Sequence, residues 1–293
     1  MIRLGFLGPK GTFSELAAST YGARQFPDQS LELIPIGSIP TLFTQLENDS
    51  TLDAVIIPIE NSIEGPVVIA QDMMAQSDQL WIQDEFSIPI INHLLVLPGT
   101  DWRQVTDVVS HPQPLGQCRQ FLSSAFVHSP RLHMADSTAR AAEFVSRREP
   151  VAAGVDADTT AAIGSDGLAH RYGLEIAVPS IQDTDTNRTR FWVVGRVPSL
   201  PTGNDKTTII FSTLKDRPGG LVDILTEVSA RGINMTSISS RPTKLVLGDY
   251  LFFVDMVGHA SKEPLQSALA TIKKNASYFK WVGSYRVIEE LSC

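Results

Sequence analysis

Short apolar runs alternate with helix-like stretches over the first 195 residues of the chain. The runs with the length and composition of β-strands cover residues 2–7, 31–36, 54–59, 105–109, 151–155 and 191–194. The stretches with a helical spacing of apolar positions cover residues 16–21, 39–46, 139–147 and 159–164. This alternation of strand and helix predicts a mainly parallel sheet with helices on its faces.

One segment of this first part, residues 81–97, is longer and less regular than the others and contains Pro89. We expect this segment to carry the chain from one lobe of the fold to another.

The chain changes character near residue 200. Residues 198–205 concentrate proline, glycine and asparagine without an apolar period, which indicates a linker. Strand, helix, strand, strand, helix and strand patterns then follow at residues 207–213, 221–231, 234–240, 250–257, 263–275 and 281–287. This βαββαβ order predicts a ferredoxin-like unit, so we expect an α/β protein of two domains.

The charge of the chain excludes some classes of partner. The 293 residues include 24 basic and 32 acidic side chains, a formal charge of -8, which argues against a nucleic-acid or anionic-membrane surface. The chain opens on a strand pattern instead of a signal peptide, and no segment is apolar enough to span a bilayer. We therefore expect a cytoplasmic protein.

The sequence gives no sign of a metal or cofactor. Cys118 and Cys293 lack metal-ligand spacing and are expected to be reduced thiols, and the six histidines show no such spacing either. No glycine-rich dinucleotide motif and no Gly-x-Ser-x-Gly motif is present. We expect a site built from hydroxyl, amide, carboxyl and arginine groups.

Polar clusters follow several predicted strands, where ligands collect in open α/β sheets. After the first strand, in residues 8–14, Thr12 or Ser14 could cap the next helix and leave backbone N–H groups for an anion. A plain helix cap is the alternative.

The clusters that follow later strands have the same character. Glu60, Asn61 and Ser62 supply a carboxyl, an amide and a hydroxyl, and turn chemistry alone does not explain Glu60. Ser110 and His111 follow the next strand. Ser137 and Thr138 come later and also suit helix caps.

Residues 183–191 place two arginines among hydroxyl and carboxylate side chains, just before an apolar strand. Arginine forks with neighbouring hydroxyls suit a small ligand that carries a carboxylate. A polar loop that only caps the strand is equally consistent with this segment alone.

Taken together and in this order, the clusters resemble the motif set of the prephenate dehydratase family. The matching segments are residues 8–14, 58–62 with Gly65, 110–113 with Gln117 and Cys118, 137–139, and 187–191. The C-terminal part resembles the ACT regulatory domain of the same enzymes at residues 218–221 and 239–242.

The resemblance implies a fold and an activity. It implies conversion of prephenate to phenylpyruvate with loss of water and carbon dioxide, feedback regulation by phenylalanine, and a homodimer or homotetramer. It implies a catalytic domain over residues 1–197 that is similar to two-lobed periplasmic binding proteins, with the substrate between the lobes. Lobe one would hold about 1–78 and 179–197, lobe two about 79–178, and the ACT domain 206–293.

The resemblance also implies roles for individual residues. It assigns the catalytic hydroxyl to Thr189, a donor to the departing oxygen; Glu60 is the alternative acid if burial raises its pKa. Arg190 either binds a substrate carboxylate or braces the loop by pairing with Asp183 or Asp185. The substrate-binding set that we expect is Thr12, Asn61, Ser62, Ser110, His111, Ser137, Thr138, Arg190 and Phe191, with Phe191 expected to pack behind the site.

The regulatory domain departs from the family pattern at two positions. Ser239 stands where the family has glutamate, and Gly220 where it has alanine. Phenylalanine is therefore expected to bind differently or more weakly, or to be replaced by another effector. The candidate effector-binding residues are Gly219, Gly220, Leu221, Asn234, Ser239 and Arg241.

Two alternatives stay open on the sequence. Arogenate dehydratase acts on a substrate with an amino group in place of the keto group. A non-catalytic amino-acid sensor would use the same cleft and ACT module. No helical segment precedes Ile2, so we expect no fused chorismate mutase.

Overall fold

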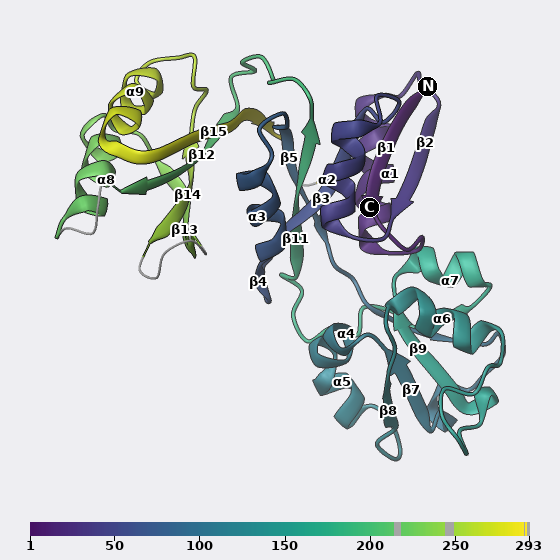
Figure 1. Cartoon of the computed structure of the whole chain (residues 1–293). Coiled ribbons are helices and arrows are strands. Elements are labelled where there is room, and N and C mark those ends of the chain that lie inside the picture. Colours follow the sequence, from purple (N-terminus) through teal and green to yellow (C-terminus); the bar gives the residue numbers. More distant parts are fainter. Residues whose placement is uncertain (214–217, 244–248, 290, 292–293) are drawn as a thin grey trace.

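The chain forms three bodies, which Figure 1 shows as a C-terminal unit, a central lobe and a lower lobe. The structure is a computed structural model that describes all residues except 214–217, 244–248, 290 and 292–293. Among the described residues, no helix has both the length and the apolar character that a membrane crossing requires.

Lobe one is the central body and is built on a sheet in the order β2-β1-β3-β11-β5. Strand β1 is parallel to β2 and β3, and β11 runs antiparallel to both β3 and β5. The elements are β1 (Ile2–Leu7), α1 (Phe13–Gln25), β2 (Leu31–Ile36), α2 (Ile39–Asn48), β3 (Ala54–Asn61), β4 (Gly65–Pro66), α3 (Val68–Gln76), β5 (Trp81–Pro89) and β11 (Arg188–Gly195).

The central strands of lobe one are buried on both faces. In β3, Val55 and Ile57 belong to the hydrophobic core on one side of the sheet, and Ala54 and Ile56 belong to the core on the other side. A strand covered on both faces needs apolar residues at consecutive positions. This is why the strand patterns in this region were readable as continuous apolar runs.

Lobe two is the lower body and has a sheet in the order β10-β6-β9-β7-β8. Two segments connect it to lobe one, residues 90–92 on the way out and 179–187 on the way back. The elements are β6 (His93–Val96), η1 (Trp102–Gln104), β7 (Asp107–Ser110), α4 (Pro112–Gln117), α5 (Arg119–Ser124), β8 (Arg131–Met134), α6 (Thr138–Ser146), η2 (Ala157–Thr159), β9 (Thr160–Gly164), α7 (Asp166–Tyr172) and β10 (Glu175–Val178).

Two predicted elements of lobe two are wrong. Residues 151–155 form turns instead of a strand, and the predicted helix at 159–164 is the strand β9, all of whose residues are buried. Strand β9 lies between β6 and β7, and its sequence Thr-Ala-Ala-Ile-Gly does not alternate between apolar and polar residues. Periodicity alone does not separate such a short buried run from a helix.

The C-terminal unit is a sheet in the order β13-β14-β12-β15 with both helices packed on one face. Its elements are β12 (Asp205–Thr213), α8 (Gly220–Ala230), β13 (Met235–Pro242), β14 (Tyr250–Val257), α9 (Leu265–Asn275) and β15 (Ala276–Val287). This is the ferredoxin-like arrangement. The predicted fold class, an α/β protein with two lobes and a βαββαβ unit, is confirmed.

The C-terminal unit is joined to lobe one by strand pairing, which the sequence does not predict. Strand β15 pairs in parallel with β5 through Arg286 with Asp84 and Val287 with Glu85, so the two sheets form one 10-stranded sheet. Phe253 and Val282 of the C-terminal unit share a hydrophobic core with lobe one. A displacement of this unit therefore acts directly on the edge of the lobe-one sheet.

Candidate active site

A cavity of about 410 Å³ lies between the two lobes, and residues from both lobes line it. The predicted site residues that line it are Thr12, Asn61, His111, Ser137, Thr138, Thr189 and Phe191. They come from the ends of β1, β3, β7 and β8 and the start of β11, as expected for the carboxyl edge of an α/β sheet.

The hydroxyl of Thr189 is oriented by the side chain of Asn61. Asn61 Nδ2 donates a hydrogen bond to Thr189 Oγ1 at 3.0 Å, across the paired strands β3 and β11. The orientation of the Asn61 amide is set because its oxygen accepts the backbone N–H groups of Ile63, at 3.0 Å, and Glu64, at 3.1 Å. The Thr189 proton has no acceptor among the described residues, so it is available to a ligand in the cavity.

A chain of side-chain amides continues from Asn61 into lobe two. Asn61 donates to Asn187 at 2.8 Å, and Asn187 donates to the Gln117 oxygen at 3.0 Å. Asn92 Nδ2 approaches the same oxygen at 3.4 Å. The Gln117 nitrogen and the Asn92 oxygen are buried and have no partner in the part of the chain that the structure describes, and both residues line the cavity. They offer a ligand one donor group and one acceptor.

Asn92, Asn187 and Gln117 are not among the residues that the sequence predicts for the site. Asn92 and Asn187 are 0% and 1% exposed, although both lie in segments that connect the lobes. An asparagine in an apolar crossover, such as Asn92 after Ile90 and Ile91, is the signal that could have pointed to them.

Helices of both lobes begin at the cavity, among them α1 of lobe one and α6 of lobe two. The side chain of Thr12 caps α1 by accepting from the Glu15 N–H at 3.4 Å, and Ser137 caps α6 by accepting from the Arg140 N–H at 3.0 Å. The N-terminal N–H groups and the helix dipole favour negative charge. None of the described lining residues is lysine or arginine, so an anion in this cavity must be held by such dipoles and by neutral donors.

Phe191 forms part of the apolar wall behind the cavity. Its ring stacks on Phe86 with centroids 5.6 Å apart, and Phe86 stacks on Tyr21 at 5.3 Å. Phe191 is 1% exposed.

Two predicted substrate-binding hydroxyls do not line the cavity. Ser110 is fully buried and donates to the Ile163 carbonyl at 2.8 Å, which joins β7 to β9. Ser62 donates to the Thr186 carbonyl at 3.0 Å and accepts the N–H of Arg188 at 3.0 Å. Both hydroxyls are used to hold the backbone of the strands and of the return segment.

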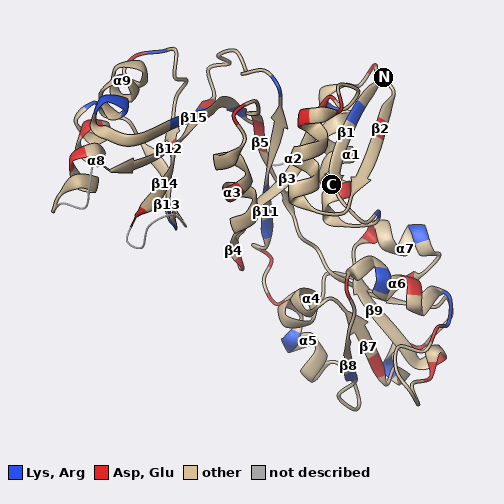
Figure 2. Cartoon of the chain, viewed as in Figure 1, with Lys and Arg blue, Asp and Glu red and all other residues tan. Residues whose placement is uncertain are grey.

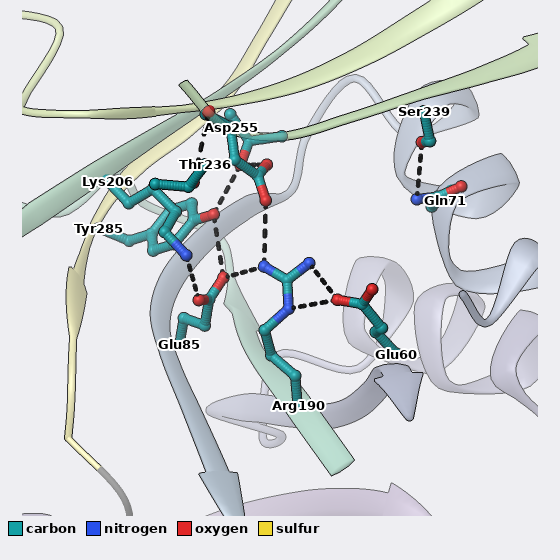
Figure 3. A network of polar contacts seen from close by, with 10 residues as sticks. Glu60, Gln71, Glu85, Arg190, Lys206, Thr236, Ser239, Asp255 and Tyr285 are labelled. Carbon is teal, nitrogen blue, oxygen red and sulfur yellow. Dashed lines mark hydrogen bonds and ion pairs between the residues drawn. The ribbon is translucent and has the colours of Figure 1, made fainter. Parts of the chain in front are cut away.

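Glu60 and Arg190 lie on the opposite face of the sheet from the cavity, because successive strand residues point to opposite faces. Arg190 pairs with Glu60 at 2.9 Å, with Glu85 at 2.8 Å and with Asp255 of the C-terminal unit at 3.0 Å (Figure 3). Arg190 is thus a brace and does not face the substrate cavity, and its partners are not the predicted Asp183 or Asp185. Glu60 also points away from the cavity, which argues against the catalytic role considered for it.

The ion pairs of Arg190 raise the pKa of its guanidinium group. Burial alone would lower its pKa, but the carboxylates of Glu85 and Asp255 outweigh burial and raise the pKa above its ordinary value. Arg190 is therefore a permanent cation.

The predicted effector residues occupy two parts of the C-terminal unit. Gly219, in a left-handed conformation with φ 84°, precedes α8, and Gly220 and Leu221 are its first residues. Ser239 of β13 instead faces lobe one and accepts from Gln71 Nε2 at 3.2 Å.

The two other predicted effector residues lie at opposite ends of β13. Asn234 immediately precedes the strand, and its carbonyl accepts the N–H of Val257 at 2.9 Å. Arg241 lies near its end, and its buried Nε has no partner among the described residues. Among the described residues, no group of three or more His, Cys, Asp or Glu side chains is placed to hold a metal ion.

The fold and the cavity define a two-lobed α/β protein with a small-molecule site between its lobes and a ferredoxin-like unit attached. Comparison with known families is more specific: the model described as prephenate dehydratase matches residues 4–199, and the model described as ACT domain matches residues 207–273. The chain belongs to the prephenate dehydratase family of lyases and carries an ACT domain.

Similar proteins support this assignment over nearly the whole chain. The prephenate dehydratase of Methanocaldococcus jannaschii is 33% identical, covering 96% of this chain and 97% of its own length. The bifunctional chorismate mutase/prephenate dehydratase of Aquifex aeolicus is 36% identical, covering 97% of this chain and 73% of its own length. A crystal structure of prephenate dehydratase from Arthrobacter aurescens in complex with L-Phe has a TM-score of 0.84 and 31% identity, with coverage of 97% and 90%.

Proposed function

We propose that the interlobe cavity binds prephenate and that Thr189 is the donor to its departing hydroxyl oxygen. The reaction expels the ring hydroxyl as water and the ring carboxylate as carbon dioxide, and it leaves phenylpyruvate. One proton must be supplied to the leaving oxygen. The observation that carries this proposal is the hydrogen bond from Asn61 to Thr189, which leaves the Thr189 proton directed to a ligand.

Asn61 also favours charge development on Thr189. As the proton moves toward the leaving oxygen, negative charge grows on Thr189 Oγ1, which already accepts the Asn61 N–H at 3.0 Å. A preorganised donor of this kind is worth most in a site from which water is excluded. The Gln117 nitrogen, which has no partner among the residues described, is a second donor for the substrate.

The two carboxylates of prephenate lie at the ring end opposite the hydroxyl. We propose that the carboxylate that remains in the product is held by Ser137 and Thr138 at the start of α6, where helix N–H groups favour an anion. The carboxylate that leaves as carbon dioxide needs weaker stabilisation, since its charge passes into the ring. The apolar side chains of Phe13, Ile90 and Phe191 line the same cavity and suit that part of the substrate.

Asp136 favours a second candidate substrate, arogenate. It lines the cavity next to Ser137, and its carboxylate would suit the ammonium group that arogenate carries in place of the keto group. A phenylpyruvate assay with prephenate and a phenylalanine assay with arogenate decide between the two. Turnover of neither substrate by the folded protein would refute both.

We propose that L-phenylalanine is the effector and that it binds to the ACT domain between two copies of the chain. A similar protein has been solved in complex with L-Phe. Strand β13 is the edge of the sheet, and Ile238 on this strand is 43% exposed; Val222 on α8 is 63% exposed. Pairing of two β13 edges would cover these side chains and bring the two sets of Gly219, Gly220 and Leu221 toward a shared interface.

Two measurements test the effector and the assembly. Light scattering should give the mass of a homodimer or of a dimer of dimers. Calorimetric titration with phenylalanine, tyrosine and tryptophan should show binding of phenylalanine, and the absence of any binding would refute an aromatic sensor.

We also propose the domain limits 1–197 and 206–293, which agree with a first family match that ends at 199 and a second that begins at 207.

A further inference from the structure

Two consecutive residues of β11 point to different parts of the molecule. Thr189 lines the cavity, whereas Arg190 points to the ACT domain (Figure 3). The neighbouring strand β3 repeats this division, since Asn61 contacts Thr189 at 3.0 Å and Glu60 contacts Arg190 at 2.9 Å. The cavity and the ACT domain are therefore separated by the thickness of one sheet at this point.

Arg190 lies in a cluster of five charged side chains, which we name the Arg190 cluster: Glu60, Glu85, Arg190, Lys206 and Asp255. Lys206 contacts Glu85 at 2.5 Å, and Arg190 contacts both Glu85 and Asp255. The side chains of Glu85 and Asp255 are only 4% and 6% exposed. Lys206 and Asp255 belong to the ACT domain, whereas the other three belong to lobe one, so the cluster joins the two units.

Hydroxyl groups of the ACT domain complete the cluster. Thr208 donates to Asp255 at 2.7 Å, and the Tyr285 hydroxyl approaches Glu85 at 3.3 Å. A buried charge that loses its partner is strongly destabilised, so the members of such a cluster move together. A shift of the ACT sheet that carries Asp255 and Lys206 must therefore move Arg190 or break the cluster.

The pairing of the strand is irregular next to Arg190. The register between β11 and β3 shifts between Arg190 and Phe191, and such irregularities re-aim neighbouring side chains. Next to the cluster, a cavity of about 10 Å³ separates lobe one from β13 and β14. Gln71 and Trp192 line this cavity, and each has a buried polar atom that no described residue partners. The interface between lobe one and the ACT domain therefore contains polar atoms whose hydrogen bonds are not satisfied by the described residues.

We infer that Arg190 is a positioning residue that sets the place of Thr189 according to the position of the ACT sheet, through its ion pair with Asp255. The ACT domain then acts on the catalytic hydroxyl by a path of two adjacent residues and one ion pair. The inference rests on the proposed donor role of Thr189, and its regulatory part rests on the proposed effector.

The first test is the rate of the full-length Asp255→Asn variant. Asparagine keeps the size of the side chain and an acceptor for Thr208, but it removes the charge that holds Arg190. We expect kcat to fall by about 5- to 50-fold, in the range of ordinary coupling between sites, while KM changes by less than about twofold. A purely structural role would lower the melting temperature without this split between kcat and KM.

A matched control exists on the opposite face of the sheet, between strands β15 and β5. Arg286 of β15 pairs with Asp84 of β5 at 3.0 Å, so it also joins the ACT domain to lobe one, but neither residue contacts Arg190. Arg286→Gln should leave kcat within about twofold of wild type. The inference is overturned if Asp255→Asn keeps the wild-type kcat, or if Arg286→Gln loses as much. Asp255→Glu, which keeps the charge but lengthens the side chain that pairs with Arg190, provides the same comparison if Asp255→Asn does not fold.

The second test measures regulation at equilibrium. The Kd of L-phenylalanine is determined with and without phenylpyruvate, because coupling between two sites is reciprocal for binding. In the wild type the two Kd values should differ, and in Asp255→Asn their ratio should move toward one. An unchanged ratio overturns the regulatory part of the inference. Wild-type protein that does not bind phenylalanine refutes the proposed effector instead, while the kcat comparison still decides whether Arg190 positions Thr189.

Discussion

Asn61 donates its side-chain N–H to the hydroxyl oxygen of Thr189 at 3.0 Å, from a neighbouring strand. Since Asn61 also accepts two backbone N–H groups, its amide cannot turn over without losing both bonds. Thr189 is therefore an acceptor from Asn61 and is left as a donor toward the cavity.

Replacing Thr189 by valine should remove turnover while leaving the shape of the cavity almost unchanged. General acid catalysis contributes about 10²- to 10⁴-fold, so we expect kcat of Thr189→Val to fall by that amount, with KM within a few-fold of wild type. Thr189→Ser keeps the hydroxyl and should retain part of the rate. Steady-state phenylpyruvate formation measures both variants, and wild-type turnover in Thr189→Val would rule out the proposed donor.

Asn61→Asp should be almost as harmful as the loss of the hydroxyl. An aspartate would still accept the two backbone N–H groups. Its other oxygen, however, would accept a hydrogen bond from the Thr189 hydroxyl, so that hydroxyl would no longer point to the substrate. We expect a fall in kcat of about 10²- to 10³-fold, as for the loss of one preorganised donor.

The double variant shows whether the two residues act as a unit. If Asn61 works through Thr189, Asn61→Asp combined with Thr189→Val should be little slower than Thr189→Val alone. If the two single-variant losses in kcat multiply in the double variant, Asn61 acts on the substrate by another route.

The sequence alone could predict that Arg190 and Thr189 face opposite sides of the sheet, because side chains alternate along a strand. Thr189 and Arg190 are adjacent in β11, so only one of them can face the cavity, and the same holds for Asn61 and Glu60 in β3. Which of the two faces meets the cavity follows from tertiary packing. The partner Asp255 could not be predicted, because it lies 65 positions away on a sheet whose attachment to lobe one has no local sequence signal.

Lobe two shows a second reason for the gaps in prediction. In lobe one, the strands Ile2–Leu7 and Leu31–Ile36 were predicted to the residue, whereas β5 lies in a segment that was predicted only as a crossover between lobes. Strand β9 is short and made mostly of alanine, isoleucine and glycine, so its burial between two strands decides its structure. The cavity residues Asn92 and Gln117 were missed because their function depends on a network that crosses the lobes.

Asp107 should make the stability of lobe two depend on acid pH. Its side chain is fully buried and accepts from Arg131 at 2.8 Å and His133 at 2.7 Å. Burial would raise its pKa, but these hydrogen bonds outweigh burial and lower the pKa. A depressed native pKa contributes stability that is complete above the unfolded value of about 3.9 and is lost as pH falls through the native pKa.

The comparison of wild type with Asp107→Asn isolates this contribution. The melting temperature of the variant should lie below that of wild type at pH 7, and the difference should shrink as the pH is lowered below about 4. A difference that stays constant down to pH 3 would contradict a native pKa below the ordinary value.

Gly11 should control how closely the two lobes approach. It lies in lobe one with φ 88°, and a methyl group at this position would overlap the side chain of Leu168 in lobe two. Next to it, Arg171 of lobe two approaches Glu15 of lobe one at 3.6 Å. Because residues of both lobes form the cavity, Gly11→Ala should hold the lobes apart and raise KM by about tenfold, the effect of roughly 1.4 kcal/mol.

Gly173→Ala separates this effect from backbone strain. Gly173 also has a positive φ, 63°, and ends the helix that carries Leu168, but a methyl group there would meet nothing within 4 Å. Both variants should lose stability from the left-handed backbone, by about 1 kcal/mol, whereas only Gly11→Ala should raise KM. Small-angle scattering should show a larger radius of gyration for Gly11→Ala than for Gly173→Ala. Equal KM values in the two variants would mean that the contact between Gly11 and Leu168 does not limit closure.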